Sequence, residues 1–404
     1  MSLPTPDETV PSGFSFRGIA VAAYGPSLLF GLGEGAVLPV LALSAKSLGA
    51  SVALAALIVT LLGIGSLLTN IPASLITARF GERSAIIVAA LWGATGLLAC
   101  VLAPGLWLFA AGVFMVGMSS AVFNLARQSY LTEAVPPAFR ARALSTLGGV
   151  MRIGIFLGPF IGAGVMHFAG LPGAYWVGVA VLLVAGGVAL TLPDLPAHGL
   201  KAPGAPQAPP TLRSITRSHS RVFLTVGLGV LLVSAVRASR QVVIPLWADH
   251  LGLNPASTSI IYGLSGAIDM LMFYPAGKVM DRRGRSWVTI PSMVLMGTAL
   301  LLMPFTVGPV SLLLASLLIG FGNGIGSGMV MTLGADYSPA HGRPQFLGVW
   351  RFLSDIGSSG GPAILSGVTA AVSLTAGILA TALLGFAAAA ALGYWVPRTR
   401  RAAD

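Results

Sequence analysis

The chain has 404 residues, of which 55% are hydrophobic and only 9% charged, and its mean hydropathy is +0.87. A soluble domain carries roughly 45–50% apolar residues, so the composition indicates a membrane protein and excludes an ordinary soluble domain. The formal net charge of +11 is interpreted as contact with an anionic inner leaflet and not with nucleic acid.

Apolar runs long enough to cross a bilayer recur along the chain. A helix needs about 20 mostly apolar residues to cross roughly 30 Å of hydrocarbon. The runs are continuous and do not alternate with polar residues, so barrel strands are not expected. The predicted fold class is an all-α polytopic membrane protein with twelve transmembrane helices. They are expected at residues 17–44, 51–78, 84–103, 105–131, 143–168, 172–193, 221–248, 257–280, 287–306, 308–335, 344–371 and 373–396.

The segments outside these helices are polar. The opening "MSLPTPDETVPSGF" has no basic region, so a disordered cytosolic tail is expected and not a cleaved signal. A Pro-rich basic stretch in the middle predicts a linker on the cytosolic side. The expected organisation is a tail at 1–16, a six-helix half at 17–193, the linker at 194–220, a second half at 221–396 and a tail at 397–404.

Basic residues outside the spans are strongly asymmetric. Of these, 17 fall on the side that carries both termini and only Lys46 falls on the other. This positive-inside pattern predicts a multi-pass protein of a bacterial-type inner membrane with both termini in the cytosol. The same residues predict contact with membrane lipids.

The two halves share a weak sequence repeat. Pro72, Arg79 and Gly81 match Pro275, Arg282 and Gly284, each at a separation of 203. Leu48-Gly49 matches Leu251-Gly252, and Pro136 matches Pro339, at the same separation. Parallel six-helix repeats are typical of secondary transporters that rock two halves around a central site.

Two motifs resemble those of the major facilitator superfamily. "PAGKVMDRRGR", from Pro275, resembles motif A, with Asp281 and Arg282; in the first half the aspartate position is Ala78. "RIGIFLGPFIGAG", from Arg152, is similar to motif C of the drug:proton antiporters, and Arg127 resembles the arginine of motif B. The resemblance covers nearly the whole chain and implies alternating access, with motifs A and C in gating.

Charged residues inside the predicted spans are candidates for function, because burying them in a bilayer is costly. They lie on polar helix faces that together predict a wet cavity between the halves. Glu34 and Asp269 are the candidate proton carriers. The expected substrate cavity comprises Tyr24, Asn124, Arg127, Gln128, Arg237, Arg240, Gln241 and Tyr262. The expected gating residues are Arg152, Gly158, Pro159, Asp281, Arg282, Arg351 and Asp355.

Three pairings are expected among these residues. Aligning Pro39 with Pro245 makes Arg240 the approximate repeat equivalent of Glu34, so the two are expected to meet across the cavity. Motion that separates them would then change the affinity of Glu34 for a proton. The alternative is a permanent ion pair of Glu34 with Arg240 or Arg237, which would carry no proton. Arg351 and Asp355, at i and i+4, are expected to pair. Glycines at 154, 158 and 162 predict a close approach of two helices, as in other membrane proteins.

The leading functional hypothesis is a monomeric secondary active exporter of small amphipathic compounds that works by proton antiport. A symporter or facilitator for uptake of a polar or anionic solute is the alternative, and a receptor of the same fold is a third. No enzyme, metal site or cofactor is expected, because the five histidines lack ligand spacing. Five intramembrane arginines against three acids predict neutral, zwitterionic or anionic substrates. "GFGNGIGSG", residues 320–328, is expected to serve helix packing.

Overall fold

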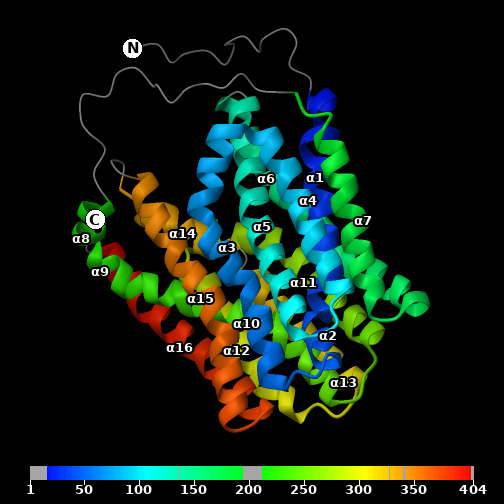
Figure 1. Ribbon diagram of the computed structural model, residues 1–404. Helices are drawn as coiled ribbons and strands as arrows, with labels where there is room; N and C mark the ends of the chain where they lie inside the picture. The colour runs from blue at the N-terminus through cyan, green and yellow to red at the C-terminus, as the bar shows by residue number, and fades with distance from the viewer. Residues whose placement is uncertain (1–15, 136, 194–211, 327, 340–342, 402–404) are drawn as a thin grey trace, which may run out of the picture.

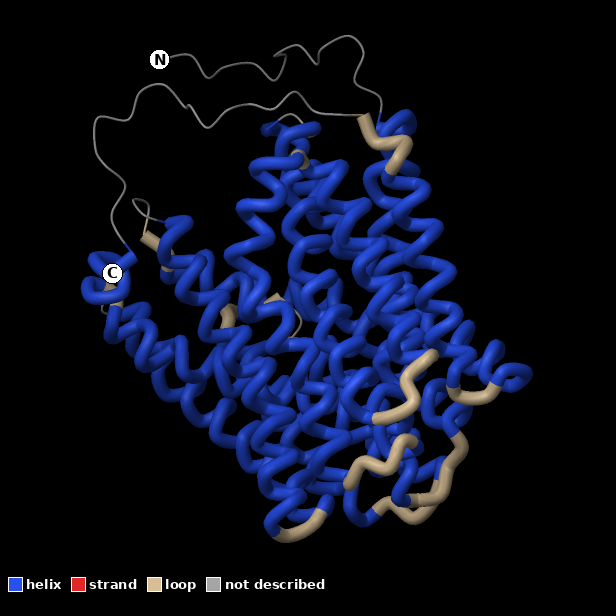
Figure 2. The backbone as a smooth tube through the Cα atoms, viewed as in Figure 1, coloured by secondary structure: helices blue, strands red, loops and turns tan. Residues whose placement is uncertain are grey.

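The computed structural model describes residues 16–135, 137–193, 212–326, 328–339 and 343–401, and this part of the chain is helical, without strands (Figures 1 and 2). Ten of its helices are long and apolar enough to cross a membrane, or 11 if the bent helix α11 (Pro255–Arg283) counts as one span. The remaining predicted span, at 344–371, corresponds to α15 (Arg343–Ala371), which is long enough but carries Arg351, Asp355 and several serines among its apolar residues. The all-α polytopic prediction is confirmed.

The first set of helices follows the predicted order. Its elements are α1 (Phe16–Val37), the 3-10 turn η1 (Leu38–Val40) and α2 (Leu41–Ser47), then α3 (Val52–Phe80), α4 (Glu82–Val101), α5 (Leu106–Ala134), α6 (Pro137–Ala169) and α7 (Pro172–Ala189). The first predicted helix is therefore broken at Leu38–Val40, where Pro39 cannot donate a backbone hydrogen bond.

The second set begins with short helices. Its elements are α8 (Leu212–Ser218), α9 (Ser220–Val222), the π-helical η2 (Phe223–Gly227), α10 (Leu228–His250), α11 (Pro255–Arg283), α12 (Ser286–Leu302), the 3-10 turn η3 (Met303–Phe305), α13 (Pro309–Ile325), α14 (Met329–Tyr337), α15 (Arg343–Ala371) and α16 (Leu374–Arg401). The helix predicted at 308–335 is divided into α13 and α14.

Some predicted boundaries fall outside the described residues. This holds for residues 1–15 of the first tail and for 194–211 of the linker. The rest of the predicted linker carries helix α8, and α16 continues to Arg401, into the stretch expected to be a tail. The division of the chain at 193 and 221 stays a prediction.

The repeat in the sequence has equivalents in backbone geometry at the same separation of 203. Gly49 and Gly252 have φ of 92° and 75°, and Gly81 and Gly284 have φ of 80° and 92°. Glycine reaches these values without the steric cost that a Cβ imposes. Ser51 and Asn254 likewise cap α3 and α11 by accepting the backbone N–H of Leu54 and of Ser257. Both halves thus end and restart their helices at equivalent positions.

The ends of the bundle differ in how tightly the halves meet. We call the end with the start of α1 and the end of α16 the terminal face, and the opposite end the distal face. In Figure 1 α14, α15 and α16 lean away from α3 and α5 toward the terminal face and converge with them toward the distal face. At the distal face Lys46 of α2 forms an ion pair with Asp249 of α10, and the Ser366 hydroxyl donates to the Ala53 carbonyl over 2.7 Å.

Candidate functional site

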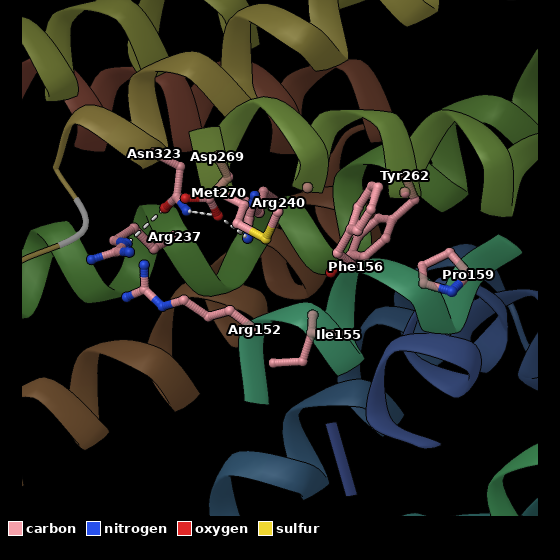
Figure 3. Close-up of a pocket in the computed structure, with 12 residues that line it drawn as sticks. Arg152, Ile155, Phe156, Pro159, Arg237, Arg240, Tyr262, Asp269, Met270 and Asn323 are labelled. Carbon is pink, nitrogen blue, oxygen red and sulfur yellow. Dashed lines mark hydrogen bonds and ion pairs between the residues drawn. The ribbon is translucent and has the colours of Figure 1, made fainter. Parts of the chain in front are cut away.

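A chain of polar contacts joins three helices of the second set. Arg240 of α10 forms an ion pair with Asp269 of α11, with 3.2 Å between Nη2 and Oδ2. Asn323 of α13 donates to the same Asp269 oxygen over 2.5 Å and accepts from Nε of Arg237 over 2.7 Å. Figure 3 shows the four side chains in this order. Arg237 and Arg240 lie at i and i+3, so one face of α10 presents both.

Glycines in α13 bring Asn323 to Asp269. A Cβ on Gly324 would lie 2.9 Å from the Asp269 Cα, and one on Gly320 would lie 2.9 Å from the Ser265 carbonyl carbon. Real Cβ atoms do not come so close, so α13 can touch α11 here only because these residues have no side chain. The stretch "GFGNGIGSG" therefore serves helix packing as predicted, and it also places Asn323 within hydrogen-bond distance of Asp269.

The opposite wall of this site comes from α6. Arg152, Phe156 and Pro159 line a cavity of about 200 Å³ together with the polar chain of α10, α11 and α13. The negative charge of Asp269 attracts the Arg152 guanidinium, and the positive charge of Arg240 repels it. Tyr262 is buried at the same cavity. The cavity therefore lies between helices of both halves and carries three arginines against one aspartate.

Two further cavities continue from it. One of about 420 Å³ shares Arg237, Arg240 and Asn323 with the first. Another of about 410 Å³ shares Gln241 with the second and reaches Asn124. Most of the lining residues come from α1, α3, α5, α6, α10, α11, α13 and α15, and α2, α4, α7 and α14 add one or two each.

Glu34 lies at the wall of the 410 Å³ cavity. It is partly buried, and among the described residues it forms no ion pair and accepts no hydrogen bond. Arg127 of α5 is the basic residue whose charge acts on it. Nε and Nη1 of Arg127 are buried without a hydrogen-bond partner in the described part of the chain. The Arg127 guanidinium lies 5.9 Å from the centre of the Phe123 ring, which stacks on Phe30.

Two of the expected pairings are wrong for this structure. Arg240 does not meet Glu34, because Asp269 of the neighbouring helix α11 binds it and Arg127 lies near Glu34 instead. Arg351 and Asp355 do not form an ion pair, since Arg351 is exposed and Asp355 accepts a hydrogen bond of 3.1 Å from Asn70 of α3. The third pairing is confirmed: a Cβ on Gly158 would lie 2.5 Å from the Ala36 nitrogen, so α6 touches α1.

The other predicted residues lie in several places. Tyr24 donates to the Ala143 carbonyl over 3.4 Å and so joins α1 to α6. Gln128 and Arg351 line a cavity of about 530 Å³ between α5 and α15. Arg282 is exposed at the terminal end of α11, and the side chain of Asp281 lies outside the described residues. Pro159 lies where α6 meets α11, with its Cβ 3.1 Å from the Cβ position of Gly263.

Sequence reasoning missed Asn323, Asn70 and the ion pair of Lys46 with Asp249. The repeat held a signal for two of them. Asn323 is separated by 203 from Ser120, which lies on a predicted cavity face, and Lys46 and Asp249 are separated by the same 203. Asn70 had no such signal, because its partner lies on α15, 285 positions away.

Comparison with known proteins identifies relatives of this arrangement. The sequence matches the family described as "Major Facilitator Superfamily" over residues 27–362 and 226–404. It is 23% identical over 212 residues to a protein named Multidrug resistance protein MdtH in Yersinia pestis and in Yersinia pseudotuberculosis, with 52% of this chain and 50% of the relative covered. The chain thus matches about half the length of these curated relatives.

Solved structures share the fold. A bacterial homologue of the human lysosomal transporter Spinster, in an inward-facing and unoccupied conformation, superposes with a TM-score of 0.77 at 15% identity, over 94% of this chain and 97% of that one. A D-xylose-proton symporter superposes with a TM-score of 0.74 at 17% identity, again over 94% and 97%. Identities this low indicate a common fold and no more.

Proposed function

Because the chain belongs to the major facilitator superfamily, it is a membrane transporter and not an enzyme, and we propose that it is a secondary active exporter of small amphipathic compounds that works by proton antiport. The observation that carries this proposal is Glu34, a carboxyl group without an ion pair among the described residues, at the wall of a cavity between the halves. A proton carrier must be reachable from the cavity and must change its surroundings as the halves move.

Alternating access accounts for the arrangement of the two ends. The ion pair of Lys46 with Asp249 closes the distal face, and the halves lean apart toward the terminal face (Figure 1). The excess of basic residues at the terminal face supports placing it in the cytosol of a bacterial-type inner membrane. In this state the cavity would receive a substrate from the cytosol, as an exporter requires. A single chain encloses the whole cavity, so we propose a monomer.

Two similarities support export. The glycines of α6 that resemble motif C of the drug:proton antiporters do pack against α1, and Pro159, which follows Gly158, lines the same cavity as Arg152. The relatives that match about half of the chain are named multidrug resistance proteins. The structures with a common fold include a proton symporter, so direction has to be measured.

Everted membrane vesicles test the direction. An acid interior should drive accumulation of a substrate in vesicles with the wild-type chain, because protons leave as the substrate enters. A protonophore should abolish the accumulation, and vesicles without the protein supply the background. Accumulation in right-side-out vesicles with an acid exterior, and none in everted ones, would contradict the proposal.

A symporter or facilitator for an anionic solute is the second candidate. The observation that favours it is the charge of the 200 Å³ cavity, where Arg152, Arg237 and Arg240 face the single carboxylate of Asp269. An anion and a proton would then bind to the cavity together, which is the requirement for symport. Strong export of a permanent cation such as ethidium, with anions ignored, would contradict this candidate and the expected substrate charge alike.

A further inference from the structure

We propose that the cavity of Arg152, Arg237 and Arg240 binds the carboxylate of an organic acid, and that Asp269 is its internal competitor for these arginines. The inference deepens the proposed transport function, on which it rests, by naming the substrate class and the residues that recognise it. It holds for either direction of transport.

The charges of the cavity require an anion. Three guanidinium groups line it and Asp269 is the one carboxylate among its lining residues. An excess of positive charge within a bilayer is costly, and a second anion in the cavity would remove much of that cost. Guanidinium groups are planar and bind carboxylates through two parallel hydrogen bonds, which makes them selective for this group.

The hydrogen bond of Arg237 leaves part of its guanidinium group available to a ligand. Asp269 uses Oδ2 for both Arg240 and Asn323. Among the described residues Arg237 makes its hydrogen bond through Nε, to Asn323, so its two terminal nitrogens remain at the cavity. Figure 3 shows the guanidinium ends of Arg152 and Arg237 next to each other, with Asn323 joined to Arg237 by a hydrogen bond. Two like charges so placed are stabilised by an anion between them.

The rest of the cavity fits an apolar body. Phe156, Ile155 and Met270 line it beside the arginines, and Tyr262 lines it as well. The adjoining cavity of about 420 Å³ shares Arg237 and Arg240 and leaves room for an extended molecule. A small aromatic or aliphatic acid would therefore place its carboxylate at the arginines and its hydrocarbon against the phenylalanine.

Binding of a probe acid tests the proposal. The purified full-length chain in detergent is titrated with 2-naphthoate by calorimetry, with 2-naphthamide and naphthalen-2-ylmethylammonium as probes of the same shape, and with protein-free micelles as the blank. We expect saturable binding of the acid, affinity about tenfold lower or less for the amide, and no saturable binding of the cation. Equal affinity for acid and amide would overturn the proposal.

Variants assign the site. Arg237→Gln and Arg152→Gln should each weaken naphthoate about tenfold or more, because a buried charged partner is removed. Asp269→Asn should strengthen it, because the competitor is lost while the side chain keeps its size. Arg283→Gln, at the exposed end of α11, serves as a control with the same change of charge and should bind as the wild type does. Unchanged affinity in Arg237→Gln would overturn the proposal.

The experiments distinguish a failure of binding from a misfolded variant and from a failure of the proposed transport function. If Arg237→Gln does not fold, the comparison of acid with amide on the wild type and the Arg152→Gln variant still decide. Because the titration uses no membrane or gradient, naphthoate binding without proton-driven transport in vesicles would refute the proposed coupling and leave the acid site standing. Proton-driven transport of neutral compounds without naphthoate binding would do the reverse.

Discussion

Lys46 and Asp249, which are 203 positions apart and occupy equivalent places in the two repeats, form an ion pair at the distal face. Lys46 lies in the last turn of α2 and Asp249 in the last turn of α10. Equivalent residues of two related halves can meet only near the axis that relates them, so the pair joins the halves where they have to separate for the cavity to open at this face. Both side chains are partly exposed, at 31% and 33%.

Removing this pair should favour opening of the distal face. Lys46→Ala or Asp249→Ala is expected to shift the equilibrium by about 0.2–1 kcal/mol, or less than about fivefold, because the pair is in contact with water. The measurement is the rate at which an impermeant thiol reagent, added from outside, labels Gln241→Cys in a Cys100→Ala background. The exchange variant Lys46→Asp with Asp249→Lys should restore slow labelling. Equally fast labelling in the exchange variant would show that the attraction is not responsible.

The orientation of the chain gives a second prediction. Arg283→Cys and Arg400→Cys, each in the Cys100→Ala background, should react with an impermeant reagent only from the cytosolic side. The reason is the distribution of basic residues in the sequence, 17 on the side predicted to be cytosolic against Lys46 alone on the other. Lys46→Cys is the matched control and should react only from outside. Labelling of either terminal position in intact cells would reverse the orientation.

Most of the fold could be predicted from sequence because membrane helices are encoded locally. The apolar runs, glycine ends and caps such as Ser51 and Asn254 act within a few residues of where they stand. The helix predicted at 308–335 was wrong in being continuous. α13 ends at Ile325 with Gly326 as its C-cap, in a stretch where repeated glycines lower helix stability. The fold class therefore followed from composition, and the breaks in the helices did not.

Several residues that line the cavities could be predicted from the sequence, but their pairings could not. The cost of burying charge identified Glu34, Arg240 and Asp269 as functional candidates without any structure. Which of them touch depends on the rotation and separation of helices far apart in sequence. The alignment of repeats placed Arg240 opposite Glu34, but in the structure Arg240 forms its ion pair with Asp269 of the adjacent helix. Pairing between helices therefore needed the three-dimensional arrangement.

The contact of α15 with α10 gives a third prediction. A Cβ on Gly361 would lie 2.6 Å from the carbonyl carbon of Ala235, whereas one on Gly360 would meet nothing within 4 Å. Gly361→Ala should therefore push the helices apart and cost about 1–3 kcal/mol, as overpacking does. Thermal unfolding in detergent should show a lower Tm for Gly361→Ala and no loss for Gly360→Ala, the neighbouring control. An equal Tm for both variants would show that the contact is not tight in solution.

The last prediction concerns the proton carrier. Glu34 forms no ion pair in the described part of the chain, so a permanent latch to Arg237 or Arg240 does not hold it in this state. The charge of Arg127 acts on it, and movement of α1 relative to α5 would change that interaction and with it the affinity for a proton. Glu34→Gln copies the protonated acid. We expect it to abolish concentrative transport and to retain exchange of substrate across vesicles at equal pH.

Two comparisons decide whether the loss reports coupling. Glu34→Asp keeps a carboxyl group and should retain pH-driven accumulation at a lower rate, whereas a purely structural role would make both variants alike. Exchange measured in the same vesicles shows that Glu34→Gln still binds and moves its substrate, so a misfolded protein is recognised by the loss of both activities. If Glu34→Gln drives substrate uphill with the pH dependence of the wild type, another group carries the proton. Asp269 is then the next candidate, because it is the acidic residue that lies at the adjoining cavity with Arg240 as its partner.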